Sequence, residues 1–407
     1  MKVLVVSDHA RRGGAAIAGH RLARAMQSQG HQVHFTAVHD DGDGDVEPIP
    51  LPSLRRGASI APAALALPAA ARLRRWVRRC EPDVVHVHNI HGARHRGLST
   101  LALAAVAERT PVVWTLHDMW SLTGRCSYPG DCRRYASQCT TSCPTAHAYP
   151  DLRPQLIPLA HVEKKTLIRR GRLVAVAPSG WLADEARHGP WASQQVHHIR
   201  NGLPLDVFHP RRRSTARLRL GVDPSPHPLL CFAAADLDDP RKGMQLLLDA
   251  LHLVERPVRV LLIGQRRRLP QLPNHVKLVA SLTPSTEDER ADAFAAADVT
   301  VHAALEDNLP NTIAESLCVG TPVVGFAIGG VREMLSAPDA GWLASSVSSR
   351  ALADALRVAC DPAHRPSPDD VAASAHARYD AVAQAAEYVA LFEQLRRAST
   401  SRKGLGR

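Results

Sequence analysis

The stretch Asp298–Leu335, DVTVHAALEDNLPNTIAESLCVGTPVVGFAIGGVREML, decides the fold of this 407-residue chain. It predicts a short β-branched strand at 299–301, a polar loop, a helix that begins beside Pro310, and a second buried strand at 323–326. Gly320 is expected to end the helix in a left-handed cap, because the proline two residues later prevents its continuation. Two parallel strands, each followed by a helix, predict an α/β fold with ligands at the carboxyl ends of the strands.

Acidic residues and paired glycines occupy the turns of this stretch. Glu306 and Asp307 lie in the loop after the first strand, and Glu315 follows about one turn into the helix. A carboxylate accepts two hydrogen bonds at once, which suits sugar hydroxyls. The helix starts, including the one after Gly329-Gly330, suit phosphate. The combination predicts a sugar nucleotide site, and the alternative is that these carboxylates are merely solvated charges.

The stretch resembles the donor-site signature of the family 4 glycosyltransferases, which are retaining enzymes of the GT-B fold. That family carries two acidic residues separated by seven others, and Asp307 and Glu315 have this spacing. The Gly-Thr-Pro-Val-Val turn at 320–324 and the Gly-Gly-x-x-Glu turn at 329–333 follow the same family pattern.

One part of the signature departs from the common pattern. The usual Glu-Gly-Phe-Gly loop is replaced by Glu-Asp-Asn-Leu-Pro-Asn, a variant of the subgroup that makes bacterial exopolysaccharides of the colanic-acid type. Either Glu306 or Asp307 therefore fills the first acidic role. The resemblance implies that this acid contacts the transferred sugar, that Glu315 binds the ribose, and that Asn308 and Leu309 line the donor site.

Two further segments resemble the family's contacts to the donor diphosphate. Gly13 and Gly14 open a helix after the first strand, where glycines let the backbone approach a ligand; a plain tight turn is the alternative. Lys242 matches the family's Lys-Gly, whose lysine would neutralise the leaving diphosphate. An arginine found upstream in many members is missing from 234–237, and Arg241 is a candidate substitute. A solvated basic turn is the alternative here.

Histidines follow two strands of the first half. His117 and Asp118 end the strand 112–116, where a histidine can hydrogen-bond sugar hydroxyls or phosphate. The resemblance implies that His117 lines the acceptor and sugar site, and Asp118 would orient His117 or touch the substrate. A purely structural histidine is the alternative.

A denser histidine cluster follows another strand. His86 and His88 are expected on one face of it, because side chains alternate along a strand, and His91 comes soon after. A metal site is one interpretation. We favour loop and acceptor-site residues, since no matching carboxylate is apparent nearby in the sequence.

Four of the eight cysteines lie in one window: Cys126, Cys132, Cys139 and Cys143. In a reducing compartment clustered thiols favour a structural zinc over disulfides. Disulfides and unligated thiols remain open alternatives, because the spacing is not that of paired CxxC knuckles. No catalytic metal is expected, since a lysine takes the place of a divalent cation.

Composition is that of a globular enzyme, with 45% hydrophobic and 22% charged residues. The net charge of +11 favours anionic partners, but no aromatic-basic interleaving or nucleic-acid motif supports nucleic acid. No apolar run reaches the roughly 20 residues that span a bilayer, and no signal peptide is apparent, so a cytoplasmic protein is expected. The basic segment 71–79 would suit peripheral contact with an anionic inner membrane; an ordinary helix packed on the sheet is the alternative.

A regular alternation of apolar strands and helices divides the chain into two halves. Strands are expected at 3–6, 33–38, 84–87, 112–116, 229–233, 258–263, 276–278, 299–301 and 323–326. The segment 201–208 resembles the family's entry into its C-terminal domain. We therefore expect two Rossmann-like, doubly wound domains facing a cleft: an acceptor-side domain at 1–203 and a donor-binding domain at 204–378. The resemblance implies that a helix near 379–397 crosses back, so that 379–407 join the first domain.

These features together predict a retaining glycosyltransferase of the hexosyltransferase type. It would move a sugar from a nucleotide-diphosphate sugar to a glycan, or to a saccharide on a polyprenyl carrier, in bacterial polysaccharide or glycoconjugate biosynthesis. A sugar-nucleotide epimerase of the GT-B fold and a non-catalytic sugar-nucleotide-binding module are the alternatives. Turnover of a donor only in the presence of an acceptor would separate the transferase from both.

Overall fold

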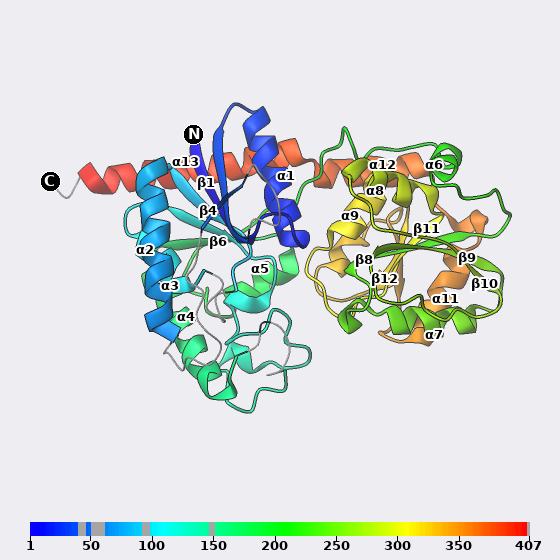
Figure 1. Ribbon diagram of the computed structural model, residues 1–407, viewed down its shortest axis with the longest axis horizontal. Coiled ribbons are helices and arrows are strands. Elements are labelled where there is room, and N and C mark those ends of the chain that lie inside the picture. The colour runs from blue at the N-terminus through cyan, green and yellow to red at the C-terminus, as the bar shows by residue number, and fades with distance from the viewer. Residues whose placement is uncertain (40–45, 50–61, 92–97, 146–149, 151, 405–407) are drawn as a thin grey trace. The chain divides into compact units, whose positions relative to one another are not determined.

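The computed structural model describes residues 1–39, 46–49, 62–91, 98–145, 150 and 152–404. Contacts within the chain divide it into two compact units. Unit 1 contains Met1–Asn201 together with Val382–Arg407, and unit 2 contains Gly202–Ala381. The last helix therefore belongs to the unit that begins the chain (Figure 1).

Unit 1 is built on a parallel sheet whose strands lie in the order β3-β2-β1-β4-β5-β6-β7. These strands are β1 (Lys2–His9), β2 (Gln32–His39), β3 (Glu47–Pro48), β4 (Val84–Val87), β5 (Val112–Thr115), β6 (Leu173–Ala177) and β7 (Val196–His198). Every residue of β4, β5 and β6 is buried, as expected for a parallel sheet covered on both faces. The strand order reverses between β1 and β4, and ligands of such sheets bind at the carboxyl ends beside that reversal.

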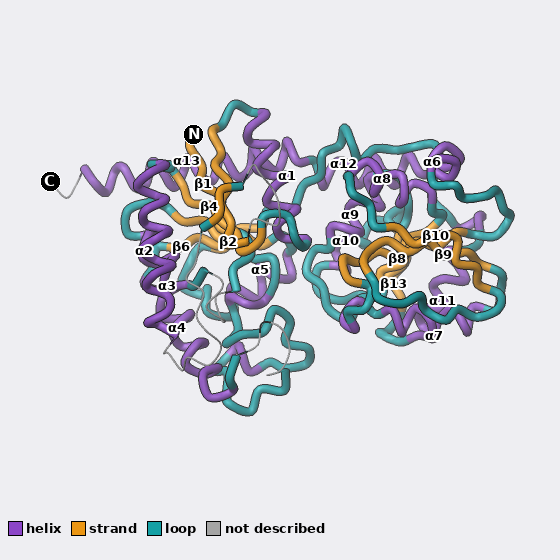
Figure 2. Tube along the Cα trace, viewed as in Figure 1, coloured by secondary structure: helices purple, strands orange, loops and turns teal. Residues whose placement is uncertain are grey.

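Helices follow most of these strands (Figure 2). They are α1 (Gly14–Ser28), α2 (Pro62–Cys80), α3 (Thr100–Ala107), α4 (Ile157–Arg170), α5 (Gly180–Arg187) and the returning α13 (Ala381–Gly404). The core of the unit is apolar and includes Leu4, Val85 and Trp114. The buried aromatic side chains Tyr388 and Phe392 of α13 lie against His86 of β4, so the last helix completes the unit.

Unit 2 repeats the architecture with the strand order β10-β9-β8-β11-β12-β13, again parallel throughout. Its strands are β8 (Leu229–Asp236), β9 (Val258–Gln265), β10 (Val276–Leu282), β11 (Val299–His302), β12 (Val323–Phe326) and β13 (Gly341–Ala344). Its helices are α6 (Arg213–Arg219), α7 (Met244–Val254), α8 (Glu287–Ala296), α9 (Asn311–Cys318), α10 (Val331–Met334), α11 (Ser349–Ala359) and α12 (Pro368–Tyr379). Here the reversal lies between β8 and β11, beside the turns that carry Lys242 and Asp307.

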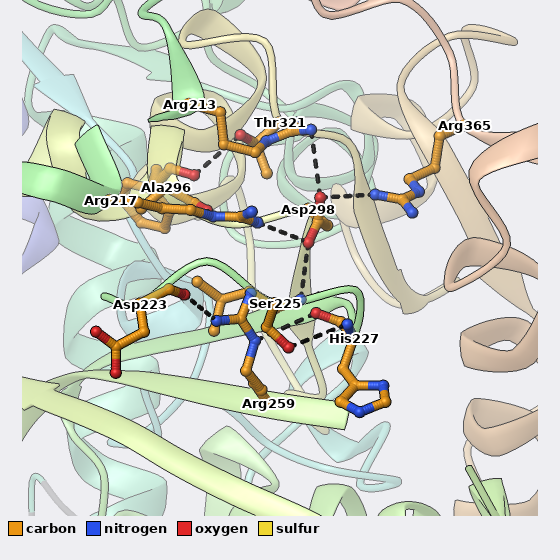
Figure 3. Close-up of polar contacts among 12 residues, drawn as sticks. Arg213, Arg217, Asp223, Ser225, His227, Arg259, Ala296, Asp298, Thr321 and Arg365 are labelled. Atoms are coloured by element: carbon orange, nitrogen blue, oxygen red, sulfur yellow. Dashed lines mark hydrogen bonds and ion pairs between the residues drawn. The ribbon is translucent and has the colours of Figure 1, made fainter. Parts of the chain in front are cut away.

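A buried carboxylate ties the opposite edge of this sheet together (Figure 3). Asp298, directly before β11, accepts hydrogen bonds from Arg217 at 2.8 Å, from Arg365 at 2.7 Å and from the backbone N–H of Leu229 at 2.8 Å. Arg213 lies 3.2 Å from the same carboxylate. Burial alone would raise the pKa of Asp298, but the Leu229 N–H and the three guanidinium groups lower it. The site is structural, because it lies at the amino end of β11.

Every strand expected from the sequence is present, and each differs from its predicted range by a few residues at most. Strands β3, β6, β7 and β13 were not predicted. The helix expected after Gly329-Gly330 is a single turn of four residues, α10, so it offers only a small helix dipole. The returning helix expected near 379–397 is present as α13, which begins at Ala381, because Tyr379 ends α12 and Asp380 pairs with Leu203 between the two helices.

Candidate functional site

A lysine and an acid meet at the carboxyl edge of the sheet in unit 2. Lys242 ends the turn η5 (Pro240–Lys242) after β8, and Asp307 lies in the loop after the neighbouring strand β11. The Lys242 ammonium donates to Asp307 Oδ2 at 2.6 Å. Gly243 adopts a φ of 75°, and a Cβ there would lie 1.8 Å from the carbonyl oxygen of Ala303. Only glycine therefore lets the turn lie against β11, and this close approach brings the two side chains together.

Asp307 stays charged at neutral pH. Burial alone would raise the pKa of Asp307, but Lys242, His302 and Arg241 together lower it to about 2. His302 Nε2 lies 3.7 Å from Asp307 Oδ2, and burial lowers the pKa of this histidine to about 4, so the ring is neutral. The site thus presents one anion and one ammonium side by side, with a second cation, Arg241, close by.

Arg241 holds the acidic loop in place through its backbone and its side chain. Its guanidinium donates to the carbonyl oxygen of Glu306 at 3.0 Å and to Asp239 Oδ2 at 3.2 Å. The backbone N–H of Leu305 donates to the carbonyl oxygen of Arg241 at 2.8 Å. The structure therefore places Arg241 beneath the loop that carries both candidate acids.

Glu315 lies on α9 with an exposed fraction of 0%, and Arg290 Nη1 of α8 is 3.9 Å from its Oε2. The loop residues Asn308 and Leu309 are also buried. A fully buried carboxylate is costly unless a cation or hydrogen-bond donors face it. The contact with Arg290 is one that the sequence did not indicate.

The paired glycines occupy turns that require their backbone freedom. Gly13 has a φ of 88° and precedes α1, and a Cβ on it would meet no atom within 4 Å. Gly14 is the first residue of α1. Gly329 has a φ of 43°, and Gly330 precedes α10. Among the described residues there is thus space beside Gly13, and glycine is required there by φ rather than by crowding.

The histidines of unit 1 form a buried group at the ends of β4 and β5. His88 Nδ1 and His117 Nε2 are 2.9 Å apart, and the rings of His86 and His88 are 4.3 Å apart between centroids. His86 Nε2 lies 2.8 Å from Thr115 Oγ1, which in turn is 2.8 Å from the hydroxyl of Tyr388. The prediction that His86 and His88 share a face is confirmed.

Asp118 does not face His117. Its Oδ2 is 2.9 Å from His91 Nε2, and its Oδ1 accepts the backbone N–H of Trp120 at 2.8 Å, which begins the turn η2 (Met119–Ser121). Burial would lower the pKa of His91, but Asp118 and Asp8 raise it. The expectation that no carboxylate accompanies the histidine cluster is therefore wrong, because strand ends distant in sequence meet at this edge.

Asp8, at the end of β1, was missed by the sequence reasoning. Its carboxylate accepts the backbone N–H of His91 at 2.6 Å and that of Leu98 at 3.2 Å, and burial raises its pKa. Lys164 of α4 was missed as well. It is buried, its ammonium lies 3.6 Å from the ring centre of Trp120, and burial lowers its pKa to about 7. For Asp8, its position at the end of a predicted strand was a signal in the sequence. The position of Lys164 beneath Trp120 is visible only in the structure.

The cysteine cluster is brought together only in part. Cys126 Sγ and Cys143 Sγ lie 3.1 Å and 3.6 Å from the hydroxyl of Thr145, while Cys139 Sγ accepts the backbone N–H of Gly124 at 3.2 Å. None of the eight cysteines, all within the described ranges, forms a disulfide. Within the described ranges, no group of three or more His, Cys, Asp or Glu side chains is arranged to hold a metal ion. The structural zinc stays a prediction.

Two family models match the chain. The model described as Glycosyltransferase Family 4 matches residues 12–207, and the model described as Glycosyl transferases group 1 matches residues 227–361. The matches fall on unit 1 and unit 2 respectively. No helix among the residues described by the structure is long and apolar enough to cross a membrane.

Two curated relatives are similar to this chain over at least 80% of their own length. The colanic acid biosynthesis glycosyl transferase WcaC of Escherichia coli is 25% identical over 82% of this chain and 85% of its own. The phosphatidyl-myo-inositol mannosyltransferase of Mycobacterium leprae is 26% identical over 83% of this chain and 80% of its own.

Solved structures share the fold. Sucrose-phosphate synthase from Thermosynechococcus elongatus superposes with a TM-score of 0.71 at 17% identity, covering 98% of this chain and 99% of that one. HepE from Anabaena, solved in complex with UDP, gives a TM-score of 0.69 at 18% identity, covering 97% of this chain and all of that one.

Proposed function

The chain belongs to the family 4 glycosyltransferases of the GT-B fold, and on that premise we propose that Lys242 and Asp307 together hold the sugar-phosphate junction of its donor. It is a glycosyltransferase that uses a nucleotide sugar, as its relatives in polysaccharide and glycoconjugate biosynthesis indicate. The proposal concerns which residues bind the donor, the stereochemistry of transfer, and the acceptor.

The contact between Lys242 and Asp307 carries the assignment. In a nucleotide sugar the transferred sugar is bonded directly to a phosphate, so the groups that bind the two must be neighbours. Asp307 lies 2.6 Å from Lys242, whereas Glu306 offers its backbone oxygen to Arg241. We therefore assign the sugar to Asp307, the phosphates to Lys242 and Arg241, and the ribose to Glu315. Asn308, Leu309 and the Gly329-Gly330 turn complete the proposed donor contacts of unit 2. For the Gly13-Gly14 turn of unit 1, the diphosphate contact that the resemblance implies stays a prediction.

Transfer in this proposal retains the anomeric configuration. The bond between the anomeric carbon and the phosphate oxygen breaks while the acceptor oxygen bonds to the same carbon, and the leaving phosphate takes the acceptor proton. The ammonium of Lys242 stabilises the negative charge that develops on the diphosphate, which is the kind of electrostatic stabilisation that contributes most to such steps. Donor cleavage needs no divalent cation in this scheme.

A saccharide, free or on a polyprenyl carrier, is the proposed acceptor, bound by unit 1 near His117. Its helices α2 and α4, which both pack against α3, suit contact with an anionic membrane (Figure 1). Arg74, Arg75, Arg78 and Arg79 of α2 are exposed, and Leu159 and Val162 of α4 are 63% and 50% exposed. Exposed basic and apolar side chains on one side of a domain favour anionic lipid surfaces.

Donor binding is the first test. We expect one of UDP, GDP, ADP and dTDP, or its sugar conjugate, to raise the melting temperature of the protein. The rise should disappear in Lys242→Ala and shrink in Asp307→Asn only for the sugar conjugate, since the aspartate is assigned to the sugar. Lys277→Ala, an exposed lysine on β10, is the control and should respond as wild type does.

Other outcomes contradict the proposal. If the rise in melting temperature shrank only for the sugar conjugate in Glu306→Gln, and not in Asp307→Asn, the sugar contact would be assigned to Glu306 instead. No response of the folded protein to any nucleotide would contradict a donor site at this edge of unit 2.

Vesicles with and without phosphatidylglycerol test the membrane contact, and equal binding to both would refute it.

A further inference from the structure

His88 is enclosed on every side that the structure describes. The backbone of α1 lies against one face of its ring, because a Cβ on Gly19 would approach three ring atoms to 3.2 Å. The ring of His86 packs against it at 4.3 Å, and His86 is itself held by Thr115 and Tyr388. His88 is 1% exposed, so its ring cannot turn to solvent.

Its two nitrogens are in different situations. Nδ1 faces Nε2 of His117 at 2.9 Å, which is a hydrogen-bond distance. Nε2 is buried and has no hydrogen-bond partner among the described residues. Burial lowers the pKa of His88 well below its usual value and that of His117 to about 4, so both rings are neutral at neutral pH.

Two neutral imidazoles can share one hydrogen bond in two ways. If His117 donated from Nε2, Nδ1 of His88 would be the acceptor and its proton would sit on the enclosed Nε2. A buried N–H without a partner is among the rarest and costliest arrangements in proteins. If His88 donates from Nδ1, its enclosed Nε2 carries only a lone pair, which is the less costly group to leave without a partner.

We propose that His88 is a positioning residue that donates its Nδ1–H to Nε2 of His117 and thereby holds His117 as the Nδ1–H tautomer. Asp118, the sequence neighbour expected to orient His117, is directed to His91 and to the N–H of Trp120 instead. The orienting partner of His117 is therefore another histidine.

The tautomer decides what His117 can do. With the lone pair of Nε2 already accepting a hydrogen bond, the ring offers an N–H from Nδ1 and has no remaining site to take a proton. In this tautomer His117 can only donate from Nδ1, so it is not the base that deprotonates the acceptor. This consequence rests on the proposed function, whereas the tautomer itself does not.

A long-range ¹H–¹⁵N correlation spectrum of the full chain, with histidine labelled in the ring, reads the tautomer directly. The His117 signals are those that disappear in His117→Gln. We expect a protonated Nδ1 and a bare Nε2 on His117 at pH 7. A protonated Nε2 in the wild-type protein overturns the proposal, whatever the transferase activity is.

Two substitutions of His88 test its role. The amide nitrogen of His88→Asn occupies the place of Nδ1 and can still donate, so the His117 signals should stay as in wild type. His88→Leu has no donor, and Nε2–H should appear on His117. An unchanged spectrum in His88→Leu overturns the role of His88. Should His88→Leu not fold, the wild-type and His88→Asn spectra still decide.

Activity then provides the second readout. With a donor and acceptor in hand, kcat should fall roughly tenfold or more in His88→Leu and recover in His88→Asn, with little change in the KM for the donor, because only a catalytic orientation is lost. Equal losses in both variants would mean that His88 is merely structural. If the spectrum showed the predicted tautomer but the protein bound no nucleotide sugar, the proposed function would be wrong and this inference would still hold.

Discussion

At the scale of single residues, Asp298 has the clearest consequences for stability. Its carboxylate is 10% exposed and meets three guanidinium groups. Asp298→Asn leaves those buried cations without their anion, so we expect a loss of about 3–5 kcal/mol in the free energy of unfolding at pH 7. Urea denaturation measures it. Asp184→Asn, which breaks an exposed pair with Arg187, is the control and should cost no more than about 0.5 kcal/mol.

The stability lost in Asp298→Asn should also depend on pH. The pKa of Asp298 is lowered in the folded protein, so its contribution is fully present above the ordinary carboxyl pKa and is lost as the pH falls through the folded value. The difference between wild type and Asp298→Asn should therefore be constant from pH 7 to pH 5 and shrink below about pH 4. A difference that persists unchanged into strong acid would contradict this.

The cysteine cluster gives a second prediction at this scale. Burial would raise the pKa of Cys143, but hydrogen bonds of Thr145 and the charge of Arg125 lower it, whereas burial raises the pKa of Cys126 and Cys139. The thiolate is the reactive form, so Cys143 should be modified first by Ellman's reagent and more slowly in Thr145→Val.

If the cysteine cluster binds zinc, we expect the opposite result, namely that Cys143 is protected from Ellman's reagent. A metal held by the four cysteines would protect Cys143 together with Cys126, Cys132 and Cys139, and metal analysis would find about one zinc per chain. Peptide mapping after partial modification identifies the thiol that reacts. The buried Cys231, Cys318 and Cys360 should react only after unfolding in either case.

At the scale of elements, the turn between β8 and α7 depends on one glycine. Gly243→Ala adds a methyl group where the Ala303 carbonyl oxygen lies 1.8 Å away, so the turn must shift. Gly221→Ala is the matched control, because Gly221 also has a positive φ, 64°, but open space around it. We expect the control to lose about 1 kcal/mol and Gly243→Ala roughly 1–3 kcal/mol more.

Nucleotide stabilisation should also disappear in Gly243→Ala, since Lys242 moves with the turn. Thermal melts with and without the nucleotide measure both effects. Equal destabilisation of the two variants, with nucleotide response intact, would show that the close approach to β11 does not position Lys242.

Patterns that are local in sequence predicted most elements. Runs such as Val84–Val87 and Val323–Phe326 are short and β-branched, and glycine and proline mark their ends. Leu173–Ala177 has the same apolar character and could have been predicted. Gly341–Ala344 carries a glycine and a tryptophan at the edge of its sheet, which is a weak strand signal.

Contacts between strand ends could not be predicted. Asp8, His91 and Asp118 meet because β1, β4 and β5 are neighbours, and only the strand order reveals this. The sequence placed Asp118 beside His117, but the backbone turns its side chain toward His91. The orientation of the His88 ring, which sets the His88–His117 contact, depends on packing against Gly19. The spacing of residues in the sequence cannot predict it.

At the scale of the whole molecule, the two units should differ when isolated. Unit 2 is one continuous segment with its own buried core, so residues 202–381 should fold alone and bind the same nucleotide as the full chain. Residues 1–201 lack α13, whose Tyr388 and Phe392 are at most 1% exposed. Each buried aromatic lost costs roughly 3–5 kcal/mol, so the loss of both is comparable with a typical domain's stability of about 5–15 kcal/mol.

Circular dichroism with melting curves measures both fragments. We expect a cooperative transition for 202–381 and none for 1–201. The transition should be restored when residues 382–404 are fused to the 1–201 fragment. A cooperative, wild-type-like melt of 1–201 would show that α13 contributes little to the unit it joins.

Because unit 1 is built from two separate segments of the chain, it cannot finish folding early in its synthesis on the ribosome. The half that is translated first is completed only after unit 2 has been made, because α13 follows unit 2 along the chain. At a synthesis rate of about 5–20 residues per second, the nascent N-terminal half waits roughly 10–40 s with the His86 face of its sheet uncovered. Unit 2 can meanwhile fold as it emerges. Newly made chains should therefore engage chaperones through the earlier half, and premature termination anywhere before α13 should leave that half as a substrate for proteolysis.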